Sequence, residues 1–497
     1  MRLRGSATSR RKRRSPTQSA GLGSRNRQAE RPGGSPAGNL IEIRFPKGSE
    51  RVLGHDLNEP LESGGERVCI GLLGSFTTDF GSVLSVSALR SIPDSEYRLA
   101  RGGTAWSSTF TAGVLSEAMA RRTGVLMIHS HGFSEAPTLS PTDERSFSEM
   151  LLRLRALLPD HAHGSVVVGR GLAVGGSVVL PGEWNRQRSV DRVRWVDDPI
   201  RVLPPPPRSF QTRGERFDRQ ELVIGQHGQA ILNASVLGVV GLGGGGSHIV
   251  QQAAHAGFGT LVLVDHDTVE TTNMSRLAGA IGLDVGRSKT EVFSALARRI
   301  RPESKVRVVT ERFPSESGIR ELKSVDVVVS CVDTLTARVE LQKFSWRYLV
   351  PLIDIGIGTR LKVEDGPRRA ESIAGHVHVY LPGGPCMWCT GLLSQEKLTE
   401  ESGGKGPEYV EGAVNPGQVV SFNGVVASMA LTEAIQLVTG FIARKDAEFF
   451  RTYDAATGDL YSLRPKNGGQ CPHGGDELGL GAPTGYSMHI GSGKHLP

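Results

Sequence analysis

The first half of the chain combines short apolar runs with amphipathic stretches between residues 40 and 198. Runs typical of buried strands lie at 67–74, 124–128 and 165–180. Apolar positions recur at helical spacing at 110–121 and 143–158. The pattern therefore predicts a first globular domain over residues 40–198.

The second half shows a stricter alternation of strand-like and helix-like patterns. Strands rich in valine and leucine are predicted at 234–243, 260–267, 306–313 and 325–333. Helices are predicted between them at 247–257 and 289–300. This alternation is typical of a mostly parallel, doubly wound sheet whose strands are buried on both faces. We therefore predict a second, Rossmann-like α/β domain over residues 215–473.

Segments of biased composition mark the boundaries of these domains. Four consecutive prolines at 204–207 form a stiff spacer, so residues 199–214 are predicted to be a linker. Residues 1–38 contain nothing that can form a core, which indicates a solvated, disordered tail or a start site assigned too early. Residues 474–497 are rich in glycine and are predicted to be flexible.

The formal net charge of +7 depends on the N-terminal tail. Ten basic residues and one acid give that tail +9, which leaves −2 for the rest of the chain. The sequence RRKRR at 10–14 can contact nucleic acid or anionic lipid, but the folded part has no excess of basic charge. The charge distribution therefore does not argue for a nucleic-acid-binding fold, and we do not expect a nucleic-acid partner.

Hydropathy and cysteine content indicate a cytoplasmic protein. The mean hydropathy is −0.20, no run of about 18 apolar residues appears, and the N-terminus lacks the apolar middle of a secretory signal. Five cysteines in 497 residues do not form a disulfide framework. We predict no membrane span and a reducing compartment.

A glycine-rich loop, GLGGGGS, follows the first predicted strand of the second domain. Gly241, Gly243 and Gly246 fit the spacing G-x-G-x-x-G, and Gly244 lies inside the motif. Glycines allow close approach of the backbone to a phosphate at the following helix N-terminus. Asp265 ends the next strand, where its carboxylate can hydrogen-bond a ribose. The loop predicts a nucleotide site, for which a dehydrogenase would be the default function.

Polar and charged residues around this loop favour ATP chemistry instead. The set comprises Arg219, Asp267, Asn273, Arg276, Lys289 and Asp333. A hydride-transfer site has little use for so many charges near the phosphates. Arg276 and Lys289 can neutralise the charge that develops as pyrophosphate leaves, and Asp333 can hold Mg²⁺.

These motifs resemble those of the ThiF/MoeB family, whose fold is shared with ubiquitin-activating enzymes. The resemblance covers residues 215–473. It implies ATP-dependent adenylation of the C-terminal glycine of a ubiquitin-like protein, with release of pyrophosphate. It also implies a homodimer, because the arginine matching Arg219 reaches the nucleotide of the partner subunit in that family.

A cysteine pair, Cys386 and Cys389, forms a C-x₂-C knuckle in this domain. A structural zinc needs four ligands, usually from two such pairs. The resemblance implies a second pair near the end of the domain, but here Cys471 is followed by His473, one residue short of that spacing. We predict a zinc site with His473 as the fourth ligand; the alternative is a degenerate knuckle held by packing.

The two other cysteines do not fit a thioester nucleophile. Cys331 lies inside a predicted strand and Cys69 lies in the first domain, so each is interpreted as a small buried hydrophobic residue. Either the adenylate passes to the sulfur of a partner, or Cys331 or a knuckle cysteine acts as the nucleophile.

A second candidate metal site lies in the sequence HSHGFSEAPTLSPTD of the first domain. His129 and His131 are two apart at a strand end, so both imidazoles face one side. Asp143 lies in the first turn of the next helix and completes an open zinc site, whose bound water would have a pKa of about 7. Ser140 through Asp143 also form a capping box, which gives Asp143 a purely structural alternative.

The pattern resembles the JAB/JAMM (MPN) zinc metalloprotease family, H-x-H-x₇-S-x₂-D, with one extra residue in the loop here. The resemblance covers roughly residues 50–190 and implies a cytidine-deaminase-like α/β fold. It implies that Asp143 is a zinc ligand and that Ser140 helps to hold the oxyanion. It also implies an upstream glutamate as general base, for which Glu66 is the candidate and Glu62 the weaker choice.

Two enzyme functions and one binding function follow. The first is a fused enzyme of a bacterial-type, possibly antiphage, conjugation system that activates a ubiquitin-like modifier and trims or removes it, together with a conjugating enzyme. The second is activation of a sulfur-carrier protein, with a sulfur donor, for cysteine, thiamine or molybdopterin synthesis. The third is an inactive interaction scaffold.

Overall fold

The computed structural model describes residues 38–57, 61, 66–100, 103–131, 134–204, 215–362, 369–403, 418–444, 450–465 and 471–481. The predicted tail (apart from Gly38), most of the predicted linker, Glu62 and residues 482–497 lie outside these ranges.

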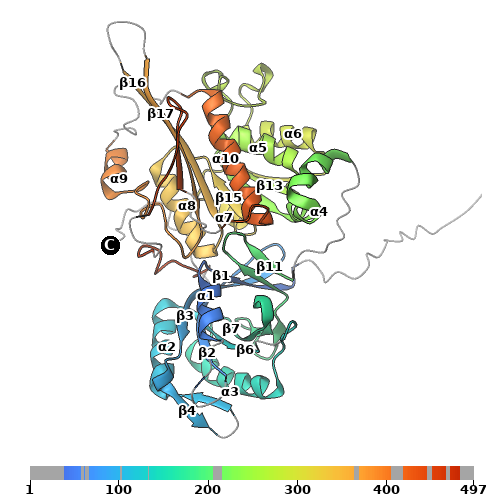
Figure 1. Ribbon diagram of the computed structural model, residues 1–497, viewed down its shortest axis with the longest axis vertical. Coiled ribbons are helices and arrows are strands. Elements are labelled where there is room, and N and C mark those ends of the chain that lie inside the picture. The colour runs from blue at the N-terminus through green and yellow to red at the C-terminus, as the bar shows by residue number, and fades with distance from the viewer. Residues whose placement is uncertain are drawn as a thin grey trace, which may run out of the picture. The chain divides into compact units, whose positions relative to one another are not determined.

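The first domain (residues 38–204) is built on a nine-stranded mixed sheet in the order β11-β10-β1-β3-β2-β6-β7-β8-β9 (Figure 1). Its strands are β1 (Leu40–Phe45), β2 (Val68–Thr77), β3 (Gly81–Ser91), β6 (Gly124–Ser130), β7 (His163–Val168), β8 (Val174–Val179), β9 (Arg188–Ser189), β10 (Arg192–Trp195) and β11 (Arg201–Leu203). A separate hairpin pairs β4 (Tyr97–Ala100) with β5 (Gly103–Trp106).

Within the described residues of this domain, three α-helices cover the sheet: α1 (Ser49–Asp56), α2 (Ser108–Arg121) and α3 (Pro141–Leu157). Apolar residues of α2 and α3 pack in one cluster against β2 and β6. Leu53 of α1 packs in a different cluster with alternate residues of the same strands, so α1 covers the opposite face. The domain is therefore a three-layer α/β structure.

Two features of this domain differ from the sequence-based prediction. The run predicted as one strand at 165–180 is two antiparallel strands, β7 and β8, because the chain turns at Gly171, whose φ is +66°. Strand β11 pairs with β10 through Leu203, so the sheet extends five residues past the predicted domain boundary at 198.

The second domain (residues 215–465) contains an eight-stranded sheet in the order β14-β13-β12-β15-β16-β17-β18-β19. The first five strands in that order are mutually parallel and the last three are antiparallel. Their bounds are β12 (Val236–Val240), β13 (Thr260–Val264), β14 (Lys305–Val309), β15 (Val327–Ser330), β16 (Leu352–Lys362), β17 (Arg369–Tyr380), β18 (Phe450–Asp454) and β19 (Leu460–Ser462). The Rossmann-like half was predicted, whereas the antiparallel half was not.

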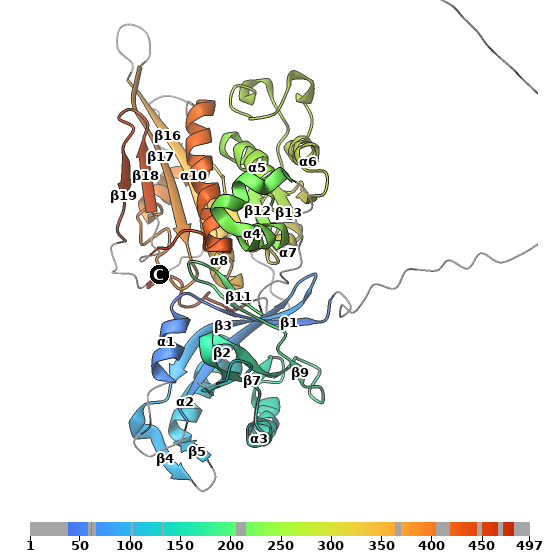
Figure 2. The same cartoon turned by 45° about the vertical axis from the view of Figure 1, so that its right-hand side comes forward.

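Helices cover both faces of the parallel part (Figures 1 and 2). On one face lie α4 (Asp218–Ala234), α5 (Gly244–Ala256), α6 (Lys289–Ile300) and α10 (Val420–Thr439). On the other lie α7 (Glu316–Leu322) and α8 (Leu335–Tyr348), and α9 (Gln395–Ser402) contacts α8. This two-sided coverage is the doubly wound arrangement.

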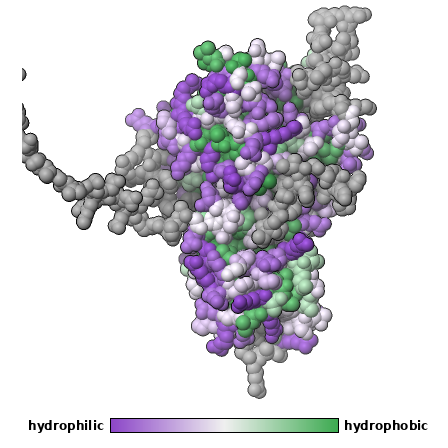
Figure 3. Space-filling model, turned by 180° about the vertical axis from the view of Figure 1, so that it is seen from behind, coloured by the Kyte–Doolittle hydropathy of each residue, from purple (hydrophilic) through white to green (hydrophobic). Residues whose placement is uncertain are grey.

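Helix α10 is the one helix among the described residues whose length and composition would allow it to cross a membrane. In the fold, 56% of that window is buried, and α10 packs against α5 and β16. Its buried residues include Asn423, Glu433 and Gln436. On the face shown in Figure 3, hydrophobic patches are separated by hydrophilic surface.

The chain returns to both sheets in a closing segment, residues 471–481. Gly479 N–H donates to Trp346 O at 2.9 Å, beside the end of α8, and Gly479 O accepts from Ser85 Oγ of β3 at 2.7 Å. Gly481 forms a parallel bridge with Ser75 of β2. Residues 474–481, for which flexibility was predicted, thus have backbone or side-chain partners in both domains.

Candidate functional site

The glycine-rich loop joins β12 to α5, and its glycines are required by close contacts. Gly241 has φ +87°, and a Cβ added at Gly246 would lie 1.9 Å from Gly241 O. Helix α5 begins at Gly244, and Gly241, Gly243 and Gly244 line a pocket at this helix N-terminus. The loop is therefore a backbone cradle of the kind that binds phosphate.

Asp265 braces this loop. Its Oδ2 accepts from Leu242 N at 2.6 Å and its Oδ1 accepts from Asp267 N at 2.8 Å, and the residue is 8% exposed. A ribose contact, as predicted, would use the lone pairs that remain on these two oxygens.

The predicted Lys289 is held at the pocket wall by an ion pair. Its Nζ donates to Asp267 Oδ2 at 2.7 Å, and the lysine is 7% exposed. Burial raises the pKa of Asp267, but the hydrogen bond and charge of Lys289 outweigh burial and lower it. The ammonium is thus kept beside the place where a phosphate would lie.

The other predicted residues fall into two groups. Asn273, Arg276 and Asp333 line the same pocket, which has a volume of about 570 Å³. Asn273 Oδ1 accepts from Glu270 N, and Arg276 donates to Thr272 O. Arg219 is exposed on α4 and does not line the pocket in a single chain.

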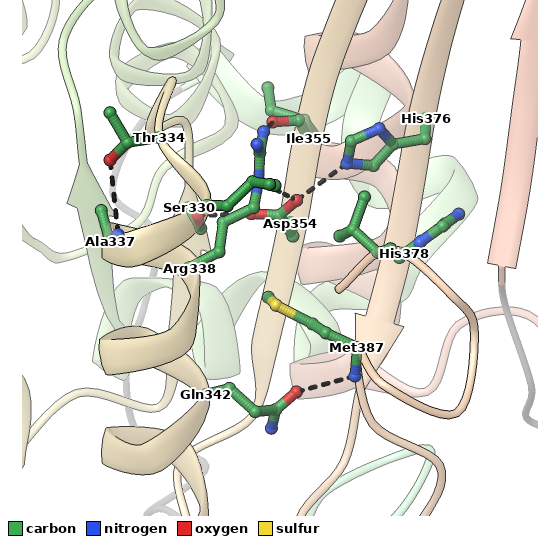
Figure 4. A network of polar contacts seen from close by, with 12 residues as sticks. Ser330, Thr334, Ala337, Arg338, Gln342, Asp354, Ile355, His376, His378 and Met387 are labelled. Carbon is green, nitrogen blue, oxygen red and sulfur yellow. Dashed lines mark hydrogen bonds and ion pairs between the residues drawn. The ribbon is translucent and has the colours of Figure 1, made fainter. Parts of the chain in front are cut away.

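A buried polar network at the far wall of this pocket was missed by the sequence analysis (Figure 4). Asp354 of β16 is fully buried and accepts from Ser330 Oγ at 2.5 Å, Arg338 Nε at 3.0 Å and His376 Nε2 at 2.8 Å. Arg338, His376 and His378 line the pocket. The signal was present, because the sequence HVH at 376–378 repeats the H-x-H spacing that was noticed at 129–131.

In the first domain, four predicted residues converge in a histidine–carboxylate cluster (Glu66, His129, His131 and Asp143). His129 Nε2 lies 3.3 Å from Asp143 Oδ1, and His131 Nε2 lies 4.0 Å from Asp143 Oδ2 and 3.6 Å from Glu66 Oε1. His129 Nε2 is buried without a hydrogen-bond partner among the described residues. Two ligands about 2.0–2.1 Å from a tetrahedral zinc lie about 3.3–3.4 Å apart, so the His129–Asp143 pair fits that ion.

Asp143 forms the predicted capping box and also contacts His129. The capping box forms, because Asp143 Oδ2 accepts from Ser140 N at 2.7 Å and Ser140 Oγ accepts from Asp143 N at 3.3 Å. The other oxygen, Oδ1, faces His129. Burial raises the pKa of Asp143, but the Ser140 hydrogen bonds and then His129 outweigh it and lower it. One carboxylate therefore serves both the cap and the cluster.

The knuckle region forms a cysteine–histidine cluster (Cys386, Cys389, Cys471 and His473). The ligand atoms of all four lie within 4.8 Å of one another. Cys386 Sγ lies 3.7 Å from Cys389 Sγ and 3.5 Å from His473 Nδ1, and Cys471 Sγ lies 4.0 Å from that nitrogen. Thiolates about 2.3 Å from a tetrahedral zinc lie about 3.8 Å apart, so this cluster fits a four-ligand zinc.

The thiols differ in acidity. A hydrogen bond with Cys386 lowers the pKa of Cys471 to about 5, whereas burial raises the pKa of Cys69 to about 12. Burial also raises the pKa of Cys331, although it lines the nucleotide pocket. Neither Cys69 nor Cys331 has the lowered pKa of an activated nucleophile.

A family model for the ThiF family matches residues 217–473. The chain belongs to the ThiF family. The match covers about half of the chain and coincides with the second domain and the Cys386–His473 region. It does not extend to the first domain, whose assignment as a JAB/JAMM domain remains a prediction.

Curated proteins similar to this chain include adenylyltransferases. The chain is 27% identical over 253 residues to the Adenylyltransferase and sulfurtransferase MOCS3 of Drosophila willistoni, covering 50% of each chain. It is 28% identical over 231 residues to the Molybdopterin-synthase adenylyltransferase of Escherichia coli, covering 46% of this chain and 82% of that protein. The chain thus spans about half the length of the first curated relatives that it matches.

Among solved structures, E. coli MccB with ATP is 20% identical, with a TM-score of 0.42. The similarity covers 55% of this chain and 75% of MccB.

Proposed function

We propose that the second domain adenylates the C-terminal carboxylate of a small sulfur-carrier or ubiquitin-like protein with ATP. The observation that carries this proposal is the single pocket that joins the glycine cradle to Lys289, Arg276 and Asp333. The relatives named as adenylyltransferases support it.

The proposed chemistry assigns one task to each group. The carboxylate of the carrier attacks the α-phosphorus of ATP, the bond to the bridging oxygen breaks, and pyrophosphate leaves. Lys289 and Arg276 stabilise the charge that gathers on the pyrophosphate, and Asp333 would hold the Mg²⁺ that accompanies ATP. The backbone N–H groups at the start of α5 bind phosphate oxygens.

Between the two enzyme functions, a sulfur carrier is the better supported substrate. The names of the relatives refer to a sulfurtransferase and to molybdopterin synthase. A thioester with the chain itself is disfavoured, because burial raises the pKa of Cys331 and the knuckle cysteines form a closed cluster. Conjugation of a ubiquitin-like modifier, with a conjugating enzyme as partner, is the second candidate.

We further propose that the first domain is a zinc hydrolase that acts on the same carrier. His129, His131 and Asp143 would hold the ion, and a zinc-bound water would supply the nucleophile. Glu66 lies beside His131, where it can move a proton to the leaving amine. Both domains would recognise the same flexible tail that ends in glycine, so the two activities of one chain would act on the same part of the carrier.

The proposal includes a second copy of the chain in the cytoplasm. Arg219 is exposed beside Leu222 and Val223 on α4, and these two apolar side chains are 81% and 68% exposed. Exposed apolar side chains next to a cation are suited to an interface between protomers. The oligomeric state in solution tests this part.

The test of adenylation is ATP–pyrophosphate exchange with a candidate carrier from the same genome. Wild-type protein should exchange label only when the carrier retains its C-terminal glycine. Asp333→Ala and Lys289→Ala should each reduce exchange at least 100-fold, while the exposed control Asp459→Ala should not. Exchange that persists in Asp333→Ala would show that the site assignment is wrong.

A further inference from the structure

We propose that His376, held by Asp354, is the base that takes a proton from the thiol that attacks the acyl adenylate. The inference rests on the proposed adenylation and adds the residue that serves the step after it. It concerns a part of the pocket that the glycine-loop motifs do not reach.

Asp354 carries a negative charge at the centre of this network. Burial raises the pKa of this carboxyl group, but the Arg338 charge and the hydrogen bonds from His376 and Ser330 outweigh burial and lower it. The group is therefore an ionised carboxylate, which can only accept hydrogen bonds. Three donors converge on it, as Figure 4 shows.

The carboxylate fixes the orientation of His376. Because Asp354 Oδ2 only accepts, the His376 nitrogen at 2.8 Å, Nε2, carries the hydrogen. In the neutral ring the lone pair then lies on Nδ1, for which the described part of the chain provides no hydrogen-bond partner. A buried carboxylate that orients an imidazole is the arrangement used to prepare a histidine base.

The free edge of the ring faces the nucleotide pocket. His376 is 17% exposed in its side chain, and it lines the same pocket as the glycine cradle and Asp333. A Cβ added at Gly356 would lie 2.6 Å from His376 Cε1 and 3.2 Å from His376 Nδ1, so glycine at this position leaves the Cε1–Nδ1 edge of the ring uncovered on this side. A small nucleophile can therefore reach Nδ1 from the pocket.

The charged and titratable groups around His376 come from three elements. Asp354 on β16 is negative and Arg338 on α8 is positive, so their charges offset one another. His378 on β17 lies with its ring 4.8 Å away, and burial lowers its pKa to about 2, so it stays neutral. Thr452 of β18, paired with His376 in register, adds no charge.

The step balances without a change in oxidation state. The sulfur of a thiol or hydrosulfide attacks the acyl carbon, and the bond from that carbon to the phosphate oxygen breaks. AMP leaves with the electron pair, and a thioester or thiocarboxylate forms. The thiol proton passes to His376 Nδ1 and then to solvent.

The experiment supplies the intermediate directly, so that it does not depend on adenylation. Synthetic N-acetyl-glycylglycyl adenylate is mixed with 2-mercaptoethanol and full-length protein, and AMP release is followed. Wild-type protein should accelerate thiolysis. His376→Ala should lower that acceleration by about 100-fold or more, the range typical of a lost general base, and added imidazole should restore part of it.

Two variants separate catalysis from structure. Asp354→Asn should also slow thiolysis, but imidazole should not restore it, because the ring of His376 still fills the site. His255→Ala, an exposed histidine outside the pocket, is the matched control. His376→Gln keeps a hydrogen-bond donor for Asp354, so a loss of activity in this variant would not result from a broken network. Its thiolysis should be as slow as that of His376→Ala.

The outcomes are distinct from those of the exchange assay. Unchanged thiolysis in His376→Ala, no acceleration by wild type, or a loss that imidazole does not restore would each overturn the role of His376. The proposed adenylation would be overturned separately, by the absence of carrier-dependent ATP–pyrophosphate exchange.

Discussion

The two candidate metal clusters of this chain differ in the number and the exposure of the residues that could bind a metal. The cysteine–histidine cluster has four ligands, two of them almost fully buried cysteines, at distances that match the edges of a zinc tetrahedron. The histidine–carboxylate cluster brings Glu66, His129 and His131 within 4.8 Å of one another, and in our proposal His129, His131 and Asp143 would be the three ligands, with Glu66, 53% exposed, beside them. A closed set of four leaves no position for water, whereas a set of three does.

This difference between the two clusters indicates that they have different roles. The ligands of the closed cluster come from two segments far apart in the sequence, so a metal there would cross-link the second domain to the closing segment. The ligands of the open cluster come from the end of β6 and the start of α3, which the sheet and the capping box already hold. A metal there would add chemistry rather than stability.

The largest expected effect is loss of the closed cluster. We expect Cys386→Ser to lower the free energy of unfolding by about 4 kcal/mol or more, because a structural zinc contributes its binding energy to folding. Chemical denaturation and metal analysis, expected to fall from two zinc ions per chain to one, measure this. The control is Cys331→Ser, which should retain both ions; equal stability of the two variants would contradict the structural role.

A second prediction concerns the open cluster. His131→Ala should remove one zinc ion per chain and abolish hydrolysis of a carrier fusion, while the melting temperature changes by no more than about 4 °C, since the side chain is partly exposed. His161→Ala, a half-buried histidine of the same domain outside the cluster, should keep both the ion and the activity. A large loss of stability in His131→Ala would show that the open cluster, like the closed one, stabilises the fold, which would contradict the prediction.

Glu66→Gln should separate catalysis from metal binding in the open cluster. We expect two zinc ions per chain and unchanged stability, but hydrolysis slower by about 10²–10⁴-fold, as for loss of a general base. Single-turnover cleavage of a carrier fusion measures this effect, with Glu135→Gln as the exposed control. Full activity in Glu66→Gln would mean that another group moves the proton.

The smallest effect concerns the double role of Asp143. Ser140→Ala removes the hydrogen bond to Asp143 N and should cost about 1 kcal/mol of stability, as for other lost N-caps. Ser140→Thr, which retains a hydroxyl, should restore most of it. If Ser140→Ala also lost zinc, the cap would be needed to aim the carboxylate.

The sequence predicted those features that depend on local pattern. The glycine cradle, the capping box at Ser140 and the parallel half of the second sheet all follow from residue types at fixed spacing. The antiparallel strands β17 to β19 could not be predicted in this way, because their pairing depends on partners distant in the sequence. The run 165–180 was misread as one strand, since its turn is made by glycines within an apolar stretch.

The polar network around Asp354 shows a different limit. Asp354 lies in the apolar sequence LIDIGIG, where a single acid resembles an ordinary strand end. Its importance appears only when Ser330, Arg338 and His376, from three elements, converge on it. The repeated H-x-H spacing was the available clue in the sequence. It indicates a site only if the histidines lie on the face of the strand that meets the pocket.

The closing segment has a consequence for synthesis on the ribosome. Gly74 of β2 leaves room for the backbone of the closing segment, because a Cβ there would lie 2.2 Å from Gly479 O. The first domain emerges early, yet this backbone partner is translated only after the whole second domain, tens of seconds later at about 5–20 residues per second. The backbone of β2 around Gly74 and Ser75 therefore lacks this partner until translation reaches Gly481.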